Sequence, residues 1–112
     1  MTEQPQAFRR AGTLIVFREL GNHAPDILMT ERSQGMSFAG GALVFPGGAV
    51  DTADEELAHR IGASDDWEDV AARIAAIRET LEEAGLAVGF DQPCDAATTQ
   101  QMRNALSAGI SF

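Results

Sequence analysis

The stretch that decides the fold is Arg78–Leu86, which reads R-E-T-L-E-E-A-G-L. Its three glutamates stand at i, i+3 and i+4, so a helix places Glu79, Glu82 and Glu83 on one face. The apolar residues recur at helical spacing on roughly the opposite side: Ile74, Ile77 and Leu81. We therefore predict an amphipathic helix that buries one face in a core and presents a carboxylate cluster on the other.

This cluster is poorly placed for stability. Gly85 is a natural residue for ending the helix, so Glu82 and Glu83 fall in its last turn, where negative charge opposes the helix dipole at a cost of about 0.3–1 kcal/mol each. Arg78 can pair with Glu82 at i, i+4, but one arginine does not neutralise three carboxylates. A divalent cation with oxygen ligands would neutralise them. Taken alone, the cluster is more simply explained as a solvated acidic face.

A glycine loop upstream strengthens the functional interpretation. Ala42–Val44 is a short apolar run that predicts a strand, and it leads into Phe45-Pro46-Gly47-Gly48. Two adjacent glycines bring bare backbone into a tight loop, where the carbonyl of Gly47 can reach a metal and the amide of Gly48 can reach a phosphate. A purely structural turn would explain the two glycines equally well.

Together, the loop and the acidic helix resemble the Nudix hydrolases, whose pattern is G-x5-E-x7-R-E-U-x-E-E-x-G-U, with U a bulky aliphatic residue. Aligning the first glycine with Gly48 places Asp54 in the position of the first glutamate. Residues 78–86 match the second half, with Thr80 in the first aliphatic position. Residues 55–77 number 23 where the pattern has seven, so about 16 are inserted between the loop and the helix.

The resemblance implies a role for each matching residue. Glu82 and Glu83 would be the principal ligands of Mg²⁺ or Mn²⁺, joined by Glu79 and the carbonyl of Gly47. Glu79 and Glu82 would also take part in catalysis, with Glu79 as a ligand or the base that orients water, and Arg78 would orient a glutamate through a salt bridge. The metal would bridge phosphate oxygens and activate a bound water for attack on phosphorus. The substrate class is a nucleoside diphosphate linked to another moiety, which is cut at the pyrophosphate.

A second element resembles the coenzyme A diphosphatases of the same family. Leu28–Ser33, Gly41 and Phe45–Gly48 fit the spacing of L-L-T-x-R-S-x3-R-x3-G-x3-F-P-G-G. Ser37 stands where the second arginine of that element should be, which removes one phosphate contact. Arg32 remains as a cation for a substrate phosphate, although an ordinary strand end with a surface arginine explains it equally well.

Composition bounds the remaining possibilities. The chain has 112 residues and one cysteine, Cys94, which cannot form an internal disulfide, so we expect a cytoplasmic protein. It has no apolar run near 18 residues, so no membrane segment is expected. The net charge of −9 disfavours binding to nucleic acid or an anionic membrane surface. The expected partner is a small molecule.

The pattern of elements predicts an α/β fold, specifically a Nudix-type α/β/α sandwich with a mixed sheet. We expect residues 1–112 to form a single Nudix domain that is the N-terminal part of a longer domain, because the family has further strands after its catalytic helix. The incomplete sheet would leave an unpaired edge, which is compatible with a homodimer. The predicted strands are 13–18, 27–30, 42–45 and 86–90, and the predicted helices are 52–60, 66–84 and 96–108. Thr52 and Glu55 are expected to cap the first helix, and Asp95 the last.

Three functions remain open at this point. The first is a metal-dependent Nudix pyrophosphohydrolase acting on a nucleoside diphosphate derivative, such as coenzyme A or an acyl-coenzyme A. The alternative is a catalytically inactive Nudix-like module that binds a nucleotide or a protein, which the insertion and the short chain favour. The third is a structural domain whose acidic helix is a solvated face.

Overall fold

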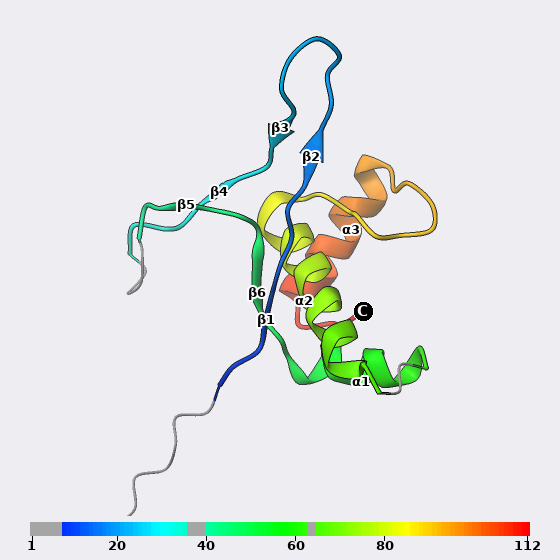
Figure 1. The fold of residues 1–112 in the computed structure, drawn as a ribbon. Coiled ribbons are helices and arrows are strands. Elements are labelled where there is room, and N and C mark those ends of the chain that lie inside the picture. The colour runs from blue at the N-terminus through cyan, green and yellow to red at the C-terminus, as the bar shows by residue number, and fades with distance from the viewer. Residues whose placement is uncertain (1–7, 36–39, 63–64) are drawn as a thin grey trace, which may run out of the picture.

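The computed structural model describes residues 8–35, 40–62 and 65–112, which form six short strands and three helices. The strands are β1 (Ala11–Thr13), β2 (Phe17–Arg18), β3 (Asp26–Ile27), β4 (Thr30–Glu31), β5 (Leu43–Val44) and β6 (Gly47–Ala49). The helices are α1 (Thr52–Arg60), α2 (Trp67–Ala84) and α3 (Ala96–Ser107). Figure 1 shows all three helices on one side of β1 and β6, while the β2–β3 hairpin projects beyond them. The predicted α/β class is confirmed, and every described strand pair is antiparallel.

Helix α2 is the element that the sequence predicts best. It runs from Trp67 to Ala84 and ends at Gly85, which has the left-handed backbone conformation (φ 66°) that favours glycine at a helix end. Leu81 is fully buried and Ile74 nearly so, and both lie on the face opposite the carboxylates. The core around α2 is built largely of small side chains, namely Ala58, Ala71, Ala75 and Ala76.

Small residues let α2 lie directly across the β1–β6 pair. Gly12 and Gly48 face each other in this ladder, and both are turned toward α2. A Cβ atom on Gly12 would overlap the backbone carbonyl oxygen of Ala72, and one on Gly48 would lie 2.5 Å from Cδ of Glu79. The prediction of a loop at Gly47-Gly48 is therefore wrong. These residues form strand β6, in which the missing side chain of Gly48 makes room for α2 and that of Gly47 makes room for the backbone of β1.

The hairpin prediction is confirmed, with different strand bounds. Phe17 pairs with Ile27, and Arg18 pairs with Asp26. The predicted strand 13–18 is interrupted because the chain changes partners along it. Leu14 still donates its N–H to Pro46, whereas Val16 already accepts from Leu28, both at 2.9 Å.

The predicted strand 86–90 is wrong. No strand is assigned between α2 and α3, and Gly89 within this segment has a φ of 79°, outside the extended range. A Cβ atom on Gly89 would lie 2.7 Å from the side chain of Ile77, so the segment is pressed against α2 and does not extend a sheet.

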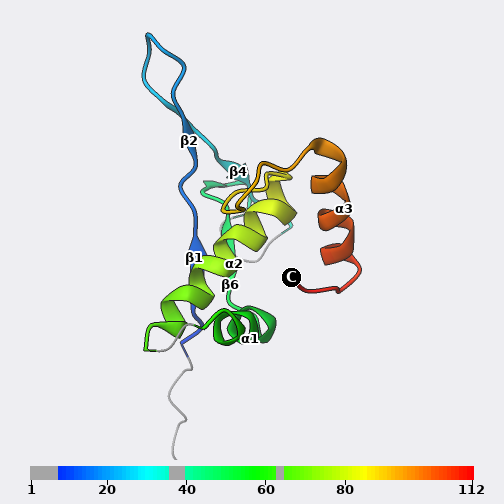
Figure 2. The same cartoon turned by 90° about the vertical axis from the view of Figure 1, so that its right-hand side faces the viewer.

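Helices α1 and α3 pack on α2, as Figure 2 shows from the side. The range predicted for α1 is confirmed, but its capping pair lies one position earlier than expected. Asp51 is the N-cap residue, and its N–H donates to the side chain of Asp54 at 2.8 Å. For α3 the expected cap is confirmed, because Asp95 accepts from the N–H of Thr98 at 2.7 Å, which lowers the pKa of Asp95. None of the helices in the described part of the chain is long and apolar enough to cross a membrane.

Candidate functional site

The centre of the candidate site is Arg78, which is buried on α2. Its guanidinium group makes a two-pronged ion pair with Asp54, with Nε at 3.0 Å and Nη2 at 2.9 Å from the two carboxylate oxygens. Nη2 also donates to the carbonyl of Ala49 at 3.1 Å, and Nη1 lies 3.1 Å from Glu79 and 3.4 Å from Glu82. These contacts raise the pKa of Arg78, the largest contribution being the hydrogen bonds to Asp54.

The pair between Asp54 and Arg78 explains how the inserted residues are accommodated. Asp54 is only 2% exposed and belongs to the first turn of α1, while Arg78 lies in the second half of α2. The described residues between them form the rest of α1 and the start of α2, and these two helices pack against each other. Trp67 in this segment packs against His59, with ring centres 4.8 Å apart. Asp54 thus pairs with the residue of α2 that begins the acidic motif, despite the insertion.

The three predicted carboxylates point to two sides of α2. Glu82 lines a small hollow of about 160 Å³ that also includes Asp51, Asp54 and Arg78. Glu83 lines a groove of about 500 Å³ together with Gly47 and Gly48. Glu79 lies between them, bound to Arg78 and packed on Gly48. The structure brings Glu79 and Glu83 close to β6, whereas Glu82 is held on the Arg78 side.

On this face the pKa values of Glu82 and Glu83 are raised, although Arg78 pairs with Glu79 and Glu82. Burial raises the pKa of Glu82, and the charge of Glu79 raises it further. Burial also raises the pKa of Glu83, with added contributions from the charge of Glu79 and a hydrogen bond shared with it. The backbone of Gly47 lowers the pKa of Glu83, and the charge and hydrogen bond of Arg78 lower that of Glu82.

The direction of the Gly47 peptide groups follows from the ladder. Leu14 donates to Pro46 at 2.9 Å, which makes Thr13 and Gly47 a non-hydrogen-bonded pair. The N–H and C=O of Gly47 therefore point away from β1. The backbone of Gly47 can therefore face Glu83 although it belongs to an extended strand. The sequence pattern predicts a loop for this exposed backbone.

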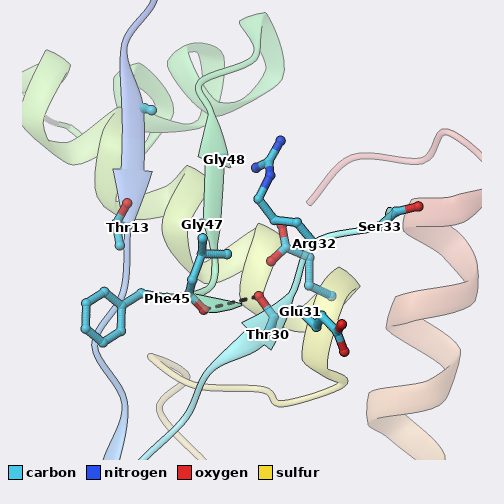
Figure 3. Close-up of a pocket in the computed structure, with 11 residues that line it drawn as sticks. Thr13, Thr30, Glu31, Arg32, Ser33, Phe45, Gly47 and Gly48 are labelled. Atoms are coloured by element: carbon cyan, nitrogen blue, oxygen red, sulfur yellow. Dashed lines mark hydrogen bonds between the residues drawn. The ribbon is translucent and has the colours of Figure 1, made fainter. Parts of the chain in front are cut away.

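Arg32 lies in the same groove as Glu83. Figure 3 shows its side chain running alongside the strand that carries Gly47 and Gly48. Its backbone is fixed by a ladder-like pair with residues 41 and 42, because Arg32 donates to Ala42 and accepts from Gly41, at 2.9 and 2.8 Å. The structure thus joins Arg32, Gly47, Gly48 and Glu83 around one hollow. Ser37, the expected departure from the coenzyme A element, lies outside the described residues.

These residues fit a divalent cation by the chemistry of their donors. Carboxylate oxygens from Glu79, Glu82 and Glu83 are the donors that Mg²⁺ and Mn²⁺ prefer. The Glu79 side chain fills the space next to Gly48. A bound cation would offset the repulsion from neighbouring carboxylates that contributes to the raised pKa of Glu83. The side chains are near one another but not gathered: residues 8–35, 40–62 and 65–112 contain no group of three or more His, Cys, Asp or Glu side chains arranged to share one ion.

Sequence reasoning missed one residue that supports the carboxylate face. Arg103 on α3 donates from Nε to the backbone carbonyl of Glu82 at 3.0 Å, and its guanidinium lies near Gly85. It places positive charge at the C-terminal end of α2, where the helix dipole favours it. No local pattern could have found this contact, because it joins two helices that are brought together only by the fold.

Comparison with known proteins agrees with this geometry. No protein-family model matches the chain. Among solved structures, it matches the crystal structure of a NUDIX hydrolase from Alicyclobacillus acidocaldarius with a TM-score of 0.64 and 33% sequence identity. The match covers 92% of this chain and 53% of that one, so the chain spans about half the length of the solved hydrolase. The acidic helix, the paired arginine and the glycine strand of this chain agree with that similarity to a NUDIX hydrolase.

Proposed function

We propose that this chain carries the metal-binding part of a Mg²⁺- or Mn²⁺-dependent Nudix pyrophosphohydrolase that acts on a nucleoside diphosphate derivative in the cytoplasm. The observation that supports this most is that Glu79 and Glu83 lie against the bare backbone of Gly48 and Gly47, beside a groove of about 500 Å³, while Arg78 holds Glu82 on the same helix. Such a surface repels a phosphorylated substrate unless a cation intervenes.

Each residue then has a role that follows from its contacts. Glu82 and Glu83 would be the principal ligands, with Glu79 as a further ligand or as the base that orients the attacking water. The cation, when bound, supplies charge neutralisation at the phosphate oxygens and a more acidic water. Arg78 holds Glu79 and Glu82 through Nη1, and Asp54 fixes Arg78 from the other side. The backbone of Gly47 and Gly48 lines the groove where the diphosphate would lie.

The preferred substrate in this proposal is coenzyme A or an acyl-coenzyme A. The support is the element Leu28–Ser33, Gly41 and Phe45–Gly48, together with the position of Arg32 in the groove beside Glu83. Arg32 would contact a substrate phosphate with a charge-assisted hydrogen bond.

The test is mass spectrometry of the products formed from coenzyme A, ADP-ribose, NADH and diadenosine polyphosphates in the presence of Mn²⁺. The proposal expects phosphopantetheine and adenosine 3′,5′-bisphosphate from coenzyme A. Glu82→Gln combined with Glu83→Gln should abolish turnover, whereas Glu56→Gln, on the exposed side of α1, should not. Unchanged metal-dependent turnover in the double variant would rule out the proposed site.

A second candidate is a Nudix-like module that binds a nucleotide or a protein without cleaving it. The specific observation in its favour is that the described carboxylates are not gathered around one point, with Glu82 held toward Arg78. Binding of a dinucleotide, measured by calorimetry, without any product in the same sample would select this function.

A further inference from the structure

The peptide bond that joins the two principal carboxylates is held from outside its own helix. Arg103 on α3 donates from Nε to the backbone carbonyl of Glu82 at 3.0 Å. This carbonyl belongs to the peptide unit between Glu82 and Glu83, the two residues proposed above as the main ligands of a cation. A group bound to it therefore fixes the backbone from which both side chains leave α2.

The last turn of α2 needs such support. The last four carbonyl groups of a helix have no partner within it, and α2 ends at Ala84, with the amide of Gly85 donating to Leu81 at 3.0 Å. The carbonyl of Glu82 is among those left over. The two carboxylates of this turn oppose the helix dipole, and the turn, which the structure describes in full, has no basic residue of its own. Arg103 supplies the missing donor and positive charge from another helix.

Two further contacts fix the place of this arginine. A Cβ atom on Gly85 would lie 3.2 Å from Nη1 of Arg103, so the guanidinium group packs against the bare backbone at the end of α2. Leu106, three residues further along α3, lines the same hollow of about 160 Å³ as Glu82. The spacing places Arg103 and Leu106 on one face of α3, which lies beside α2 in Figure 2. One face of α3 therefore contacts both the backbone and the surroundings of Glu82.

We propose that Arg103 is a positioning residue for the cation, on which it acts through the peptide unit between Glu82 and Glu83. This inference rests on the proposed function. Glu82 is held toward Arg78, whereas Glu83 accepts from the backbone of Gly47, so the two carboxylates converge on one cation only if the backbone between them keeps its orientation. Groups that orient metal ligands contribute about 10–100-fold to metal affinity. Because Arg103 acts on the backbone and not on a carboxylate, we expect about tenfold.

Charge and position predict opposite results for the loss of Arg103. A positive charge near a cation site weakens binding of the cation, so removing the charge alone would raise the affinity. Removing a contact that positions the ligands would lower the affinity. A purely structural contact would lower the melting temperature and leave the affinity unchanged. The sign of the change in affinity therefore separates these three roles.

The test measures the affinity of the full chain for Mn²⁺ by electron paramagnetic resonance, which detects the free ion. Arg103→Met removes the donor and the charge and should weaken Mn²⁺ binding about tenfold. Arg103→Lys keeps a donor and the charge and should restore most of the affinity. The matched control is Arg73→Met, because Arg73 is 77% exposed on α2, pairs with Asp69 and lies more than two turns before Glu82. This control should leave the affinity unchanged.

A second measurement needs no metal. In the metal-free protein the amide of Gly85 should exchange with deuterated water faster in Arg103→Met than in the unaltered chain, because the last turn has lost its support. Amides in the middle of α2 should keep their exchange rates. Weaker Mn²⁺ binding together with faster exchange at Gly85 supports the inference. Unchanged or tighter Mn²⁺ binding in Arg103→Met overturns it, and so does an unchanged exchange rate at Gly85.

Glu82→Gln combined with Glu83→Gln separates this inference from the proposed function. If this double variant binds Mn²⁺ as tightly as the unaltered chain, the proposed cation site is wrong and Arg103 has no ligands to position. If the double variant loses Mn²⁺ while Arg103→Met keeps it, the cation site stands and only the role of Arg103 is overturned. Circular dichroism of each variant establishes that the fold is retained before affinities are compared.

Discussion

Replacing Asp54 by asparagine should destabilise the protein far more than replacing Asp51, although both carboxylates contact Nη2 of Arg78. Asp54 is 2% exposed and accepts hydrogen bonds of 2.9 and 3.0 Å from the guanidinium group. The Asp51 side chain is 61% exposed, and its carboxylate oxygen lies 3.4 Å from Nη2. Removing one partner of a buried ion pair costs about 3–5 kcal/mol, because the other charge is left uncompensated.

The contacts that Arg78 keeps with other acidic side chains place the expected value at the lower end of that range. Arg78 keeps Glu79 at 3.1 Å and Glu82 at 3.4 Å, so we expect Asp54→Asn to lower the free energy of unfolding by about 3 kcal/mol. That is a large share of the about 5–15 kcal/mol that stabilises a typical domain. Asp51→Asn should cost no more than about 1 kcal/mol, as exposed pairs do.

The assay is urea unfolding followed by circular dichroism, with the slope against urea compared between variants. An equal and small loss in both variants would refute the reasoning, because burial would then not decide the strength of the pair. Equal loss of about 3 kcal/mol in both would refute it as well, since the exposed carboxylate would be acting as a buried one.

Three further predictions concern the surroundings of this pair. Glu83→Gln should stabilise the metal-free protein at neutral pH, because the pKa of Glu83 is raised in the folded state. The gain in the free energy of unfolding should disappear as the pH falls below 4.5, the ordinary pKa of a glutamate. A gain that persists in urea melts at acid pH would contradict this. Gly12→Ala should cost more stability than Gly48→Ala in the same melts, because its methyl group meets the backbone of α2 and not a movable side chain, with overpacking worth about 1–3 kcal/mol. Arg103→Gln should lower the free energy of unfolding by about 0.3–1 kcal/mol at low salt, which lowers the melting temperature by a few degrees. An unchanged melting temperature would mean that the contact with the end of α2 contributes nothing to stability.

The helices could be predicted from the sequence because their signals are local. Apolar spacing located α2, Gly85 ended it, and Asp95 began α3. The strands were harder, because their bounds depend on partners distant in the sequence. The run 13–18 is divided between β6 and β3, and residues 86–90 have the composition of a strand but no strand beside them. Strand β6 was missed for the opposite reason, since two glycines carry no strand preference of their own.

The residues of the candidate site could be named from the family pattern, but their arrangement could not. The match of Asp54 to the first glutamate needed the fold to bring it to Arg78 across residues 55–77. The separation of Glu82 from Glu83 on two sides of α2 is a matter of side-chain contacts, which helical spacing alone does not specify. Arg103 reaches the end of α2 from another helix, so only packing reveals it.

The β1–β6 ladder also has a kinetic consequence. It joins residues 11–13 to residues 47–49, so the chain must close a long loop, at an entropic cost, before these strands can pair. The three helices make local contacts and need no such closure, so we expect them to gain structure earlier in folding. Until the ladder closes, Glu79 cannot pack against Gly48. Glu83 likewise cannot accept a hydrogen bond from the amide of Gly47. Assembly of the carboxylate face should therefore coincide with the slowest step of folding, so the proposed binding of a cation would report on the native state.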